Sequence, residues 1–458
     1  MHTFYCETAI MTCQKWRNNI LGYGLWVCFV LDLVSLTILA LCNEVSSEIF
    51  TAKHQEGRSF LGSGLNVTGT QKLLLSLNKA AVKSIQVLSC CVSDLRYLQS
   101  PDGDIIDCVL LHHQLAFDHP KLADHKLQEA PSSWPRGIVA ESNSSQSSDE
   151  ELQLWHRMGR CPTGTIPVRR TKAEDILRAV AAKKSFGRKT NEPLIPSSPP
   201  GAPQDSSSYG HEHAIAYVRG HQFHGAQASI NVWRPRIQVS HEFSLSQMWL
   251  LSGSFVRLNS IEAGWQVSPE LYGDINPRFF TYWTSDGYQS TGCYNLLCSG
   301  FIQVGHGIAL GASISPVSSF SGAQYDINIL IWKDPRTGNW WMAYGQNSVV
   351  GYWPAELFPH LRSYATMIEW GGEVVNTRPG GKHTATQMGS GHFPEQGFSQ
   401  ASYIRNIGLV DSRNQLQLPS YLHTLAQRPR CYDIKSSYNK NWGLHVYYGG
   451  PGQNPGCR

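Results

Sequence analysis

The sequence is poor in charge and lacks the most common catalytic motifs. Charged residues make up 16% of its 458 positions, below the roughly 25% of an average soluble protein. The net charge is only +4 and no basic stripe is present, so we expect no nucleic-acid partner. No G-x-S-x-G, P-loop or H-E-x-x-H motif occurs. Their absence argues against the usual serine hydrolases, nucleotide hydrolases and zinc peptidases.

The N-terminus contains an apolar run at 21–42 that follows basic residues. This order predicts a secretory signal within residues 1–42. Asp32 interrupts the run, and a charge in the middle of a bilayer is unfavourable. A cleaved signal is therefore favoured over a membrane anchor through 21–42, and a membrane is a partner only if the run is retained. Glycosylation sequons at Asn66 and Asn143 fit secretion.

Eight cysteines follow the leader, and no pair has zinc-finger spacing. In a secreted chain such cysteines predict disulfides. Two of them, five residues apart, favour a disulfide that closes a turn, with a thiol nucleophile as the alternative. The expected disulfides are Cys108–Cys161, Cys293–Cys298 and Cys431–Cys457.

A stretch rich in proline and serine, at 185–210, divides the chain. Such a composition cannot form a packed element, so we expect an exposed linker. The half before it is polar and irregular, with one recognisable helix at 169–184. There Thr171 and Glu174 form a capping box. The apolar stripe of this helix consists of Ile176, Leu177 and Val180.

The half after the linker has the alternating pattern of strands. Apolar and polar residues alternate at 224–233 and 322–332, and the second run is followed by a turn and the apolar stretch "WWMAY". This order predicts a β-hairpin. Helical periodicity is absent over long windows. We therefore expect an all-β domain at 211–458, built as a sandwich or a curved double sheet.

Two carboxylates stand in apolar, aromatic surroundings. Glu262 lies in "NSIEAGWQV" and Glu373 in "MIEWGGEVVN". If they face each other, one keeps its proton and the other loses it, which provides both an acid and a base. Such a pair can activate water as a peptidase, or serve a glycosidase. The alternative is two glutamates that are hydrogen-bonded structurally. The histidines of "HEHA" at 211–214 are expected to be solvated, and we expect no metal and no cofactor.

Several long motifs occur in order: "GRCPTGTIPVRRTK", "NSIEAGWQV", "FTYWTSDGYQSTGCYNLLCSGF", "VVGYWPAELF", "WGGEV" and "MGSGHFPEQGF". From about residue 100 onward the chain resembles the plant neprosin family. The resemblance implies a secreted zymogen of a glutamic endopeptidase that cleaves after proline in acid. It implies a sandwich of two bent antiparallel sheets, with Glu262 and Glu373 as the catalytic pair. Residues of the same motifs that could line the cleft are Trp265, Gln266, Tyr288 and Trp370.

The same resemblance divides the chain into a pro-segment at 43–184, the linker, and a catalytic domain at 211–458. The pro-segment, a small irregular α/β domain, is expected to inhibit the enzyme. The substrates expected are proline-containing proteins or peptides. The location expected is the apoplast, the cell wall or an acidic vacuole. Residues 87–99 depart from the family pattern as an insertion. The alternative in another class is a non-catalytic extracellular or cell-wall binding protein.

Overall fold

The computed structural model describes residues 67–86, 103–137, 153–181, 210–345 and 348–457. The leader at 1–42, the insertion at 87–99, the two sequons and residues 185–209 of the linker lie outside these ranges. Within the described ranges, no helix is both long and apolar enough to cross a bilayer. Residues from Asn66 onward form one compact unit, in which the described residues before the linker contact those after it.

The described part of the pro-segment combines one small antiparallel sheet with short helices. The strands pair in the order β1-β2-β3, and Cys108 of β2 forms a disulfide with Cys161. Longer elements are α3 (Val67–Leu77), β1 (Ala81–Gln86), β2 (Ile105–Leu110), β3 (Thr165–Arg169) and α4 (Ala173–Ala181). The 3-10 helices span Leu111–His113, Leu115–Asp118, Pro120–Leu122 and Leu154–Met158.

Helix α4 differs in detail from its predicted form. The expected capping box is absent, because Glu174 is exposed and Asp175 instead accepts a hydrogen bond from the backbone N–H of Lys172. Leu177 is 47% exposed, whereas Ile176 is fully buried. The buried face instead includes Asp175, which lies 3.8 Å from Arg169 of β3 and pairs with Arg178 of its own helix.

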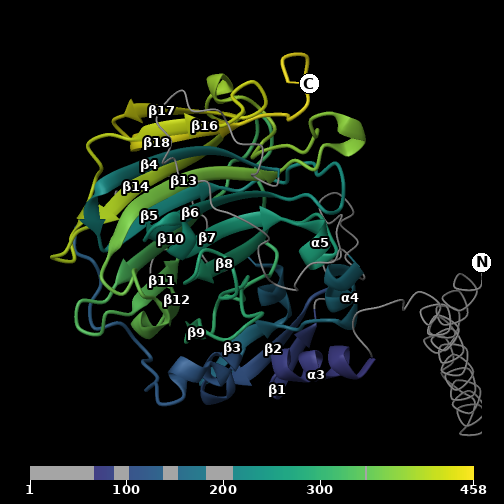
Figure 1. The fold of residues 1–458 in the computed structure, drawn as a ribbon, viewed down its shortest axis with the longest axis vertical. Helices are drawn as coiled ribbons and strands as arrows, with labels where there is room; N and C mark the ends of the chain where they lie inside the picture. Colours follow the sequence, from purple (N-terminus) through teal and green to yellow (C-terminus); the bar gives the residue numbers. More distant parts are fainter. Residues whose placement is uncertain (1–66, 87–102, 138–152, 182–209, 346–347, 458) are drawn as a thin grey trace, which may run out of the picture. The chain divides into compact units, whose positions relative to one another are not determined.

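The described residues after the linker form a sandwich of two antiparallel sheets (Figure 1). In the described residues, one sheet has six strands in the order β16-β4-β13-β6-β7-β8. Its strands are β4 (His211–Phe223), β6 (Ser244–Ser252), β7 (Asn259–Val267), β8 (Arg278–Thr284), β13 (Ala365–Val375) and β16 (His423–Ala426).

The second sheet of the described chain has the order β17-β18-β14-β5-β10-β11-β12-β9, with β15 paired to β14. Its strands are β5 (Gly225–Asn231), β9 (Ile302–Gln303), β10 (Asp326–Lys333), β11 (Trp340–Tyr344), β12 (Ser348–Trp353), β14 (Ser402–Val410), β15 (Leu416–Gln417), β17 (Asp433–Asn439) and β18 (Gly443–Gly449). Short helices of this domain are α5 (Pro269–Tyr272) and 3-10 turns at Phe255–Arg257, Ala355–Leu357, Pro379–Gly381 and Pro394–Gln396.

The main core lies between the two sheets, because the inward residues of the strands alternate with outward ones. The hairpin expected from the sequence is β10 paired with β11. Ile327, Ile329 and Ile331 of β10 are fully buried and belong to this core. A second apolar cluster, which includes Trp249, Phe280 and Tyr282, lies on the other face of the six-stranded sheet. This second face carries the candidate site.

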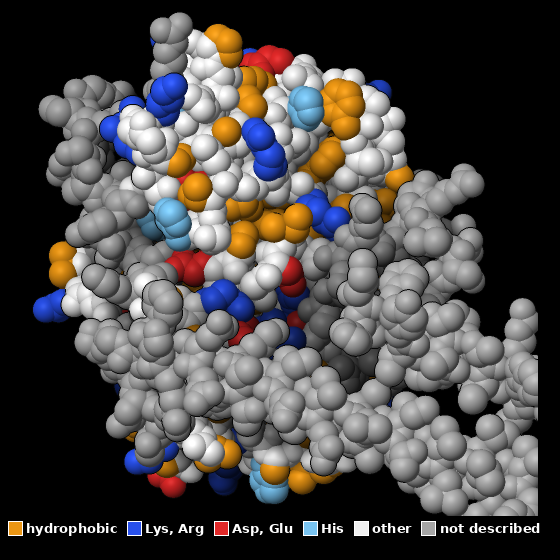
Figure 2. Space-filling view, turned by 90° about the vertical axis from the view of Figure 1, so that its right-hand side faces the viewer, with side chains coloured by type: hydrophobic (Ala, Val, Ile, Leu, Met, Phe, Trp, Pro, Cys, Tyr) orange, Lys and Arg blue, Asp and Glu red, His pale blue; other side chains and the backbone are white. Residues whose placement is uncertain are grey.

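The pro-segment is anchored to the catalytic domain by buried polar contacts. Asp104 forms an ion pair with Arg278 of β8 at 2.6 Å, and both side chains are almost completely buried. Gln153 exchanges two hydrogen bonds with the backbone of Ala309, each of 2.9 Å. Figure 2 views the side on which α4 and α5 lie in Figure 1, and acidic and basic side chains meet near its centre. The pro-segment is therefore packed on the catalytic domain as part of one fold.

Candidate active site

Three glutamates project from the same face of the six-stranded sheet. Glu262 lies on β7, and Glu369 and Glu373 lie on β13, with β6 between the two strands. Successive side chains of a strand point to opposite faces, so residues 369 and 373 share a face. The register aligns Glu262 with Trp249 and Trp249 with Glu369. The site thus contains the two predicted glutamates and a third carboxyl, Glu369, that the sequence reasoning missed.

Glu262 is completely buried and is surrounded by hydrogen-bond donors. Its carboxylate accepts a hydrogen bond from Gln247 at 2.9 Å, from Ser260 at 2.8 Å and from Tyr288 at 2.5 Å. A carboxylate can only accept hydrogen bonds, and these donors replace the water that it loses on burial. The arrangement suits an ionised Glu262.

Glu373 lies between two histidines of β4. The Nδ1 atom of His211 is 2.5 Å from Glu373 Oε1, and the Nε2 atom of His213 is 3.6 Å from Oε2. Burial acts to lower the pKa of His213. The negative charge of Glu373 outweighs this effect and, with a smaller contribution from Glu369, raises the pKa of His213. The expectation that these histidines are solvated is wrong, because both are at most 8% exposed and face a carboxylate.

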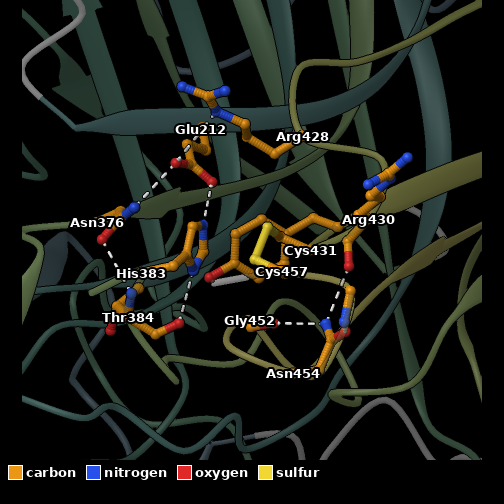
Figure 3. The surroundings of a disulfide bond; sticks show 12 residues. Glu212, Asn376, His383, Thr384, Arg428, Arg430, Cys431, Gly452, Asn454 and Cys457 are labelled. Atoms are coloured by element: carbon orange, nitrogen blue, oxygen red, sulfur yellow. Dashed lines mark hydrogen bonds and ion pairs between the residues drawn. A yellow bond between two sulfur atoms is a disulfide. The ribbon is translucent and has the colours of Figure 1, made fainter.

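Glu212, between these two histidines, points to the other face of β4 and holds the strand in place. It contacts His383 at 2.8 Å and accepts a hydrogen bond from Asn376 (Figure 3). This cluster lies beside the disulfide Cys431–Cys457. The anchored end of β4 therefore fixes the two histidines beside Glu373.

Glu369 has surroundings unlike those of the other two glutamates. It is 3% exposed, and its Oε1 atom has no hydrogen-bond partner. Burial raises the pKa of Glu369 to about 8; the charge of His213 opposes this shift, and the charges of Glu262 and Glu373 add to it. Glu369 is therefore a neutral carboxylic acid throughout the acidic range.

The segment at 286–298 covers this face with tyrosines. Tyr288 donates to Glu262, and Tyr294 packs on Tyr282 with ring centroids 4.8 Å apart. Burial, together with the charges of Glu373 and Glu262, raises the pKa of Tyr294 well above its usual value. The phenol of Tyr294 therefore interacts electrostatically with both Glu262 and Glu373. The two glutamates lie close enough to affect the same group.

Two features hold this covering segment together in acid. The cysteines Cys293 and Cys298 form a disulfide, so the sulfurs form the bond expected from their spacing and are not free thiols. Burial acts to raise the pKa of Asp286, but hydrogen bonds from Ser290 and Thr291 outweigh this effect and lower that pKa to about 2. Asp286 therefore remains ionised, and keeps its hydrogen bonds to the segment, well below neutral pH.

A row with a glycine on each side of Gln247 lies between the glutamates. Gly264, Gln247 and Gly371 are aligned across β7, β6 and β13. A Cβ atom at Gly264 would lie 2.5 Å from the Cα atom of Gln247, and one at Gly371 would lie 2.2 Å from the carbonyl oxygen of Ala214. Both glycines allow neighbouring strands to approach closely, and Gln247 between them donates its hydrogen bond to Glu262.

The tryptophans expected to line the cleft lie elsewhere. Trp265 and Trp370 are fully buried in the core between the two sheets. Each is three residues from a predicted catalytic glutamate, and an odd spacing in a strand places it on the opposite face. Gln266 shares the face of Glu262 but donates a hydrogen bond to Tyr272. Of the four predicted lining residues, only Tyr288 contacts a glutamate in the contacts described above.

Comparison with known families agrees with these motifs. The model of the neprosin activation peptide matches residues 97–217, and the neprosin model matches residues 240–451. The chain is accordingly a peptidase zymogen that carries its own activation peptide. It belongs to the neprosin family.

Solved structures with similar strands are distant. Scytalido-glutamic peptidase with a peptide-based transition-state analogue is 12% identical; the match covers 53% of this chain and 98% of that one, with a TM-score of 0.29. The eqolisin-family peptidase SCP-B with the tripeptide Ala-Ile-His is 11% identical over 52% and 97%, with a TM-score of 0.28. CG-16, a homodimeric agglutinin from chicken liver, is 8% identical over 34% and 92%, with a TM-score of 0.20.

Proposed function

We propose that the protein is the secreted zymogen of an acid-active glutamic endopeptidase that cleaves on the C-terminal side of proline. The observation that carries this proposal is the group of buried glutamates on one face of the sheet, electrostatically coupled through Glu369 and Tyr294. Interacting carboxyls ionise one at a time, and acid–base catalysis needs one in each form.

In this proposal Glu262 is the base. Its three donors suit a carboxylate, which takes a proton from the attacking water. A carboxyl of β13 polarises the scissile carbonyl and protonates the departing amine. The family resemblance gives this second role to Glu373, which lies on the same face. Both roles require the glutamates to be in opposite protonation states, which acid favours.

The preference for proline is supported by the aromatic cover of the site. Tyr282 and Tyr288 stack with ring centroids 5.7 Å apart, and Tyr288 reaches Glu262 directly. A flat aromatic face suits a proline ring, which is rigid and apolar. These tyrosines take the place of the tryptophans that the sequence suggested.

The zymogen form is supported by burial of the three carboxyls and by the position of the pro-segment. Leu77 and Leu115 of the pro-segment line a pocket together with Leu296 and Cys298 of the covering segment. A substrate therefore reaches the glutamates only after this cover moves. We propose that the pro-segment inhibits by stabilising the closed cover, and that secretion delivers the protein to an acidic apoplast or vacuole.

The test uses purified full-length protein at about pH 3, in the range where paired carboxyls share a proton. A quenched peptide with a single proline is incubated with the wild type, Glu262→Gln and the control Glu356→Gln, whose side chain is exposed. Cleavage after proline that is lost only in Glu262→Gln supports the proposal. No cleavage by folded, linker-cut wild type contradicts it and favours a binding protein, which is then tested against wall polysaccharides.

A further inference from the structure

Arg278 of β8 lies on the same face of the six-stranded sheet as the predicted catalytic glutamates. It is aligned with Gln266 of β7, which is four residues from Glu262, and an even spacing along a strand keeps side chains on one face. The same row continues through β6 to Glu373 of β13. Three strand spacings therefore separate the backbones of Arg278 and Glu373, about 14 Å. An extended peptide covers this distance in about four residues.

The guanidinium group of Arg278 is held in one orientation by residues that follow the linker. Asp274, four residues earlier in the chain, pairs with its Nη2 atom. The centre of the Tyr272 ring lies 5.1 Å from the guanidinium carbon. The carbonyl oxygen of Gly311 accepts a hydrogen bond of 2.7 Å from Nη1. Arg278 is fully buried, and a cation whose donors are fixed in this way is preorganised to bind a ligand.

A further acceptor of this guanidinium group comes from the pro-segment. Its Nη1 atom donates a hydrogen bond of 2.6 Å to the carboxylate of Asp104. Asp104 also accepts a hydrogen bond of 2.7 Å from Arg169 of the pro-segment, so these two residues leave together when the pro-segment is released. Asp274 stays, but it contacts Nη2 and Nε and not Nη1. Release thus removes an acceptor from a buried cation, which costs free energy until another acceptor takes its place.

A carboxylate is the acceptor that fits this position. Its hydrogen bonds with a guanidinium group are charge-assisted, and they are stronger than those of a neutral carbonyl oxygen. The zymogen already places a carboxylate there. Within a peptide substrate, Asp and Glu side chains supply this group. We propose that the position of the Asp104 carboxylate is a substrate subsite, in which Arg278 binds an acidic side chain about four residues from the cleaved bond.

This inference rests on the proposed function, because it assumes that a peptide lies along this face of the sheet and is cleaved by the glutamates. Asp104 occupies the subsite in the zymogen, and an acidic side chain of the substrate takes its place in the mature enzyme. Arg278 is too far from the glutamates to touch the cleaved bond. Its effect is therefore expected in the ratio of kcat/KM values between substrates, which measures discrimination.

The experiment compares pairs of quenched peptides that each contain a single proline. One member carries cysteic acid, whose sulfonate stays ionised at about pH 3, where Asp and Glu side chains are largely protonated. The other carries asparagine at the same position. This position is varied over about three to five residues on either side of the proline. Both members compete in one tube, so the ratio of their kcat/KM values does not depend on how much of the protein is activated.

Wild type, Arg278→Gln, Arg278→Lys and the control Arg413→Gln are assayed as full chains cut at the linker. Arg413 also pairs with an aspartate, but 71% of its side chain is exposed. We expect wild type to favour cysteic acid about tenfold or more at one position. Arg278→Gln should lose this preference and Arg413→Gln should keep it. Arg278→Lys should keep only part of it, because an ammonium group retains the charge but not the planar fork.

The inference is overturned if wild type cleaves the peptides with a ratio within about threefold of one at every position. It is also overturned if Arg278→Gln keeps the wild-type preference, or if Arg413→Gln loses it equally. If Arg278→Gln does not fold, as judged by near-UV circular dichroism, Arg278→Lys decides. A ratio equal to that of wild type then overturns the inference, and a lower ratio supports it. Wild type that cleaves none of the peptides contradicts the proposed function itself.

Discussion

Replacing Asp104 by asparagine tests how the pro-segment is held on the catalytic domain. Asp104 is 2% exposed, and its partner Arg278 is fully buried. Removing one member of a buried ion pair costs about 3–5 kcal/mol because the other charge remains in the interior. Asp274 and the carbonyl oxygen of Gly311 still contact Arg278, so we expect the low end, about 3 kcal/mol. This corresponds to a roughly 150-fold weaker docking equilibrium.

The assay is amide hydrogen exchange of β2 in the intact chain at about pH 6, where Asp104 is ionised. Asp118→Asn is the matched control, because Asp118 also pairs with a cation at 2.6 Å but is 48% exposed. Exposed pairs contribute about 0–1 kcal/mol, so its exchange should change by no more than about fivefold. Protection of β2 in Asp104→Asn that stays within this range would refute the reasoning.

The same pair predicts how acid acts on docking. Burial acts to raise the pKa of Asp104, but the charges of Arg278 and Arg169 outweigh this effect and lower that pKa. A lowered folded-state pKa contributes stability above the unfolded value, about 3.9, and this stability is lost as the pH falls through the folded value. Wild-type docking should therefore weaken below about pH 4, whereas that of Asp104→Asn should vary less with pH.

Two further predictions concern the site and its support. Tyr288→Phe removes a hydrogen bond to Glu262 and should lower kcat/KM on the proline peptide about tenfold, with Tm unchanged within a few degrees. Burial acts to lower the pKa of His383, but the Glu212 side chain outweighs this effect and raises that pKa. The stability that their pair contributes is therefore fully present below about pH 6.5 and is lost as the pH rises through the pKa of His383 in the folded protein. Calorimetry of Glu212→Gln should show about 2 kcal/mol of lost stability at about pH 5 and less at about pH 9; an equal loss at both would contradict this.

The alternating strand pattern of the sequence predicts the fold class and also which residues share the face of the site. Alternation alone places Trp265 and Trp370 on the face opposite to the glutamates, and the structure buries both in the core. By the same rule Glu369 shares the face of Glu373, since four residues separate them. The signal for the third carboxyl was therefore present in "MIEWGGEVVN".

Other features of the site depend on contacts between distant segments. The sequence around Glu262 does not indicate that β6 lies between β7 and β13, since the pairing of β6 with β13 joins residues more than a hundred positions apart. The burial of the histidines of β4 depends on the same kind of long-range pairing. They follow the linker directly, yet pairing of β4 with β13 brings His213 opposite Glu373.

The two glycines beside Gln247 limit how the specificity of this protein can be changed. At Gly264 and Gly371 an added methyl group would collide with backbone atoms of a neighbouring strand, so neither position accommodates a larger side chain. Variation has to come from the cover, at positions such as Tyr288. A library intended to redirect cleavage to other residues should therefore diversify the segment at 286–298 and keep both glycines constant.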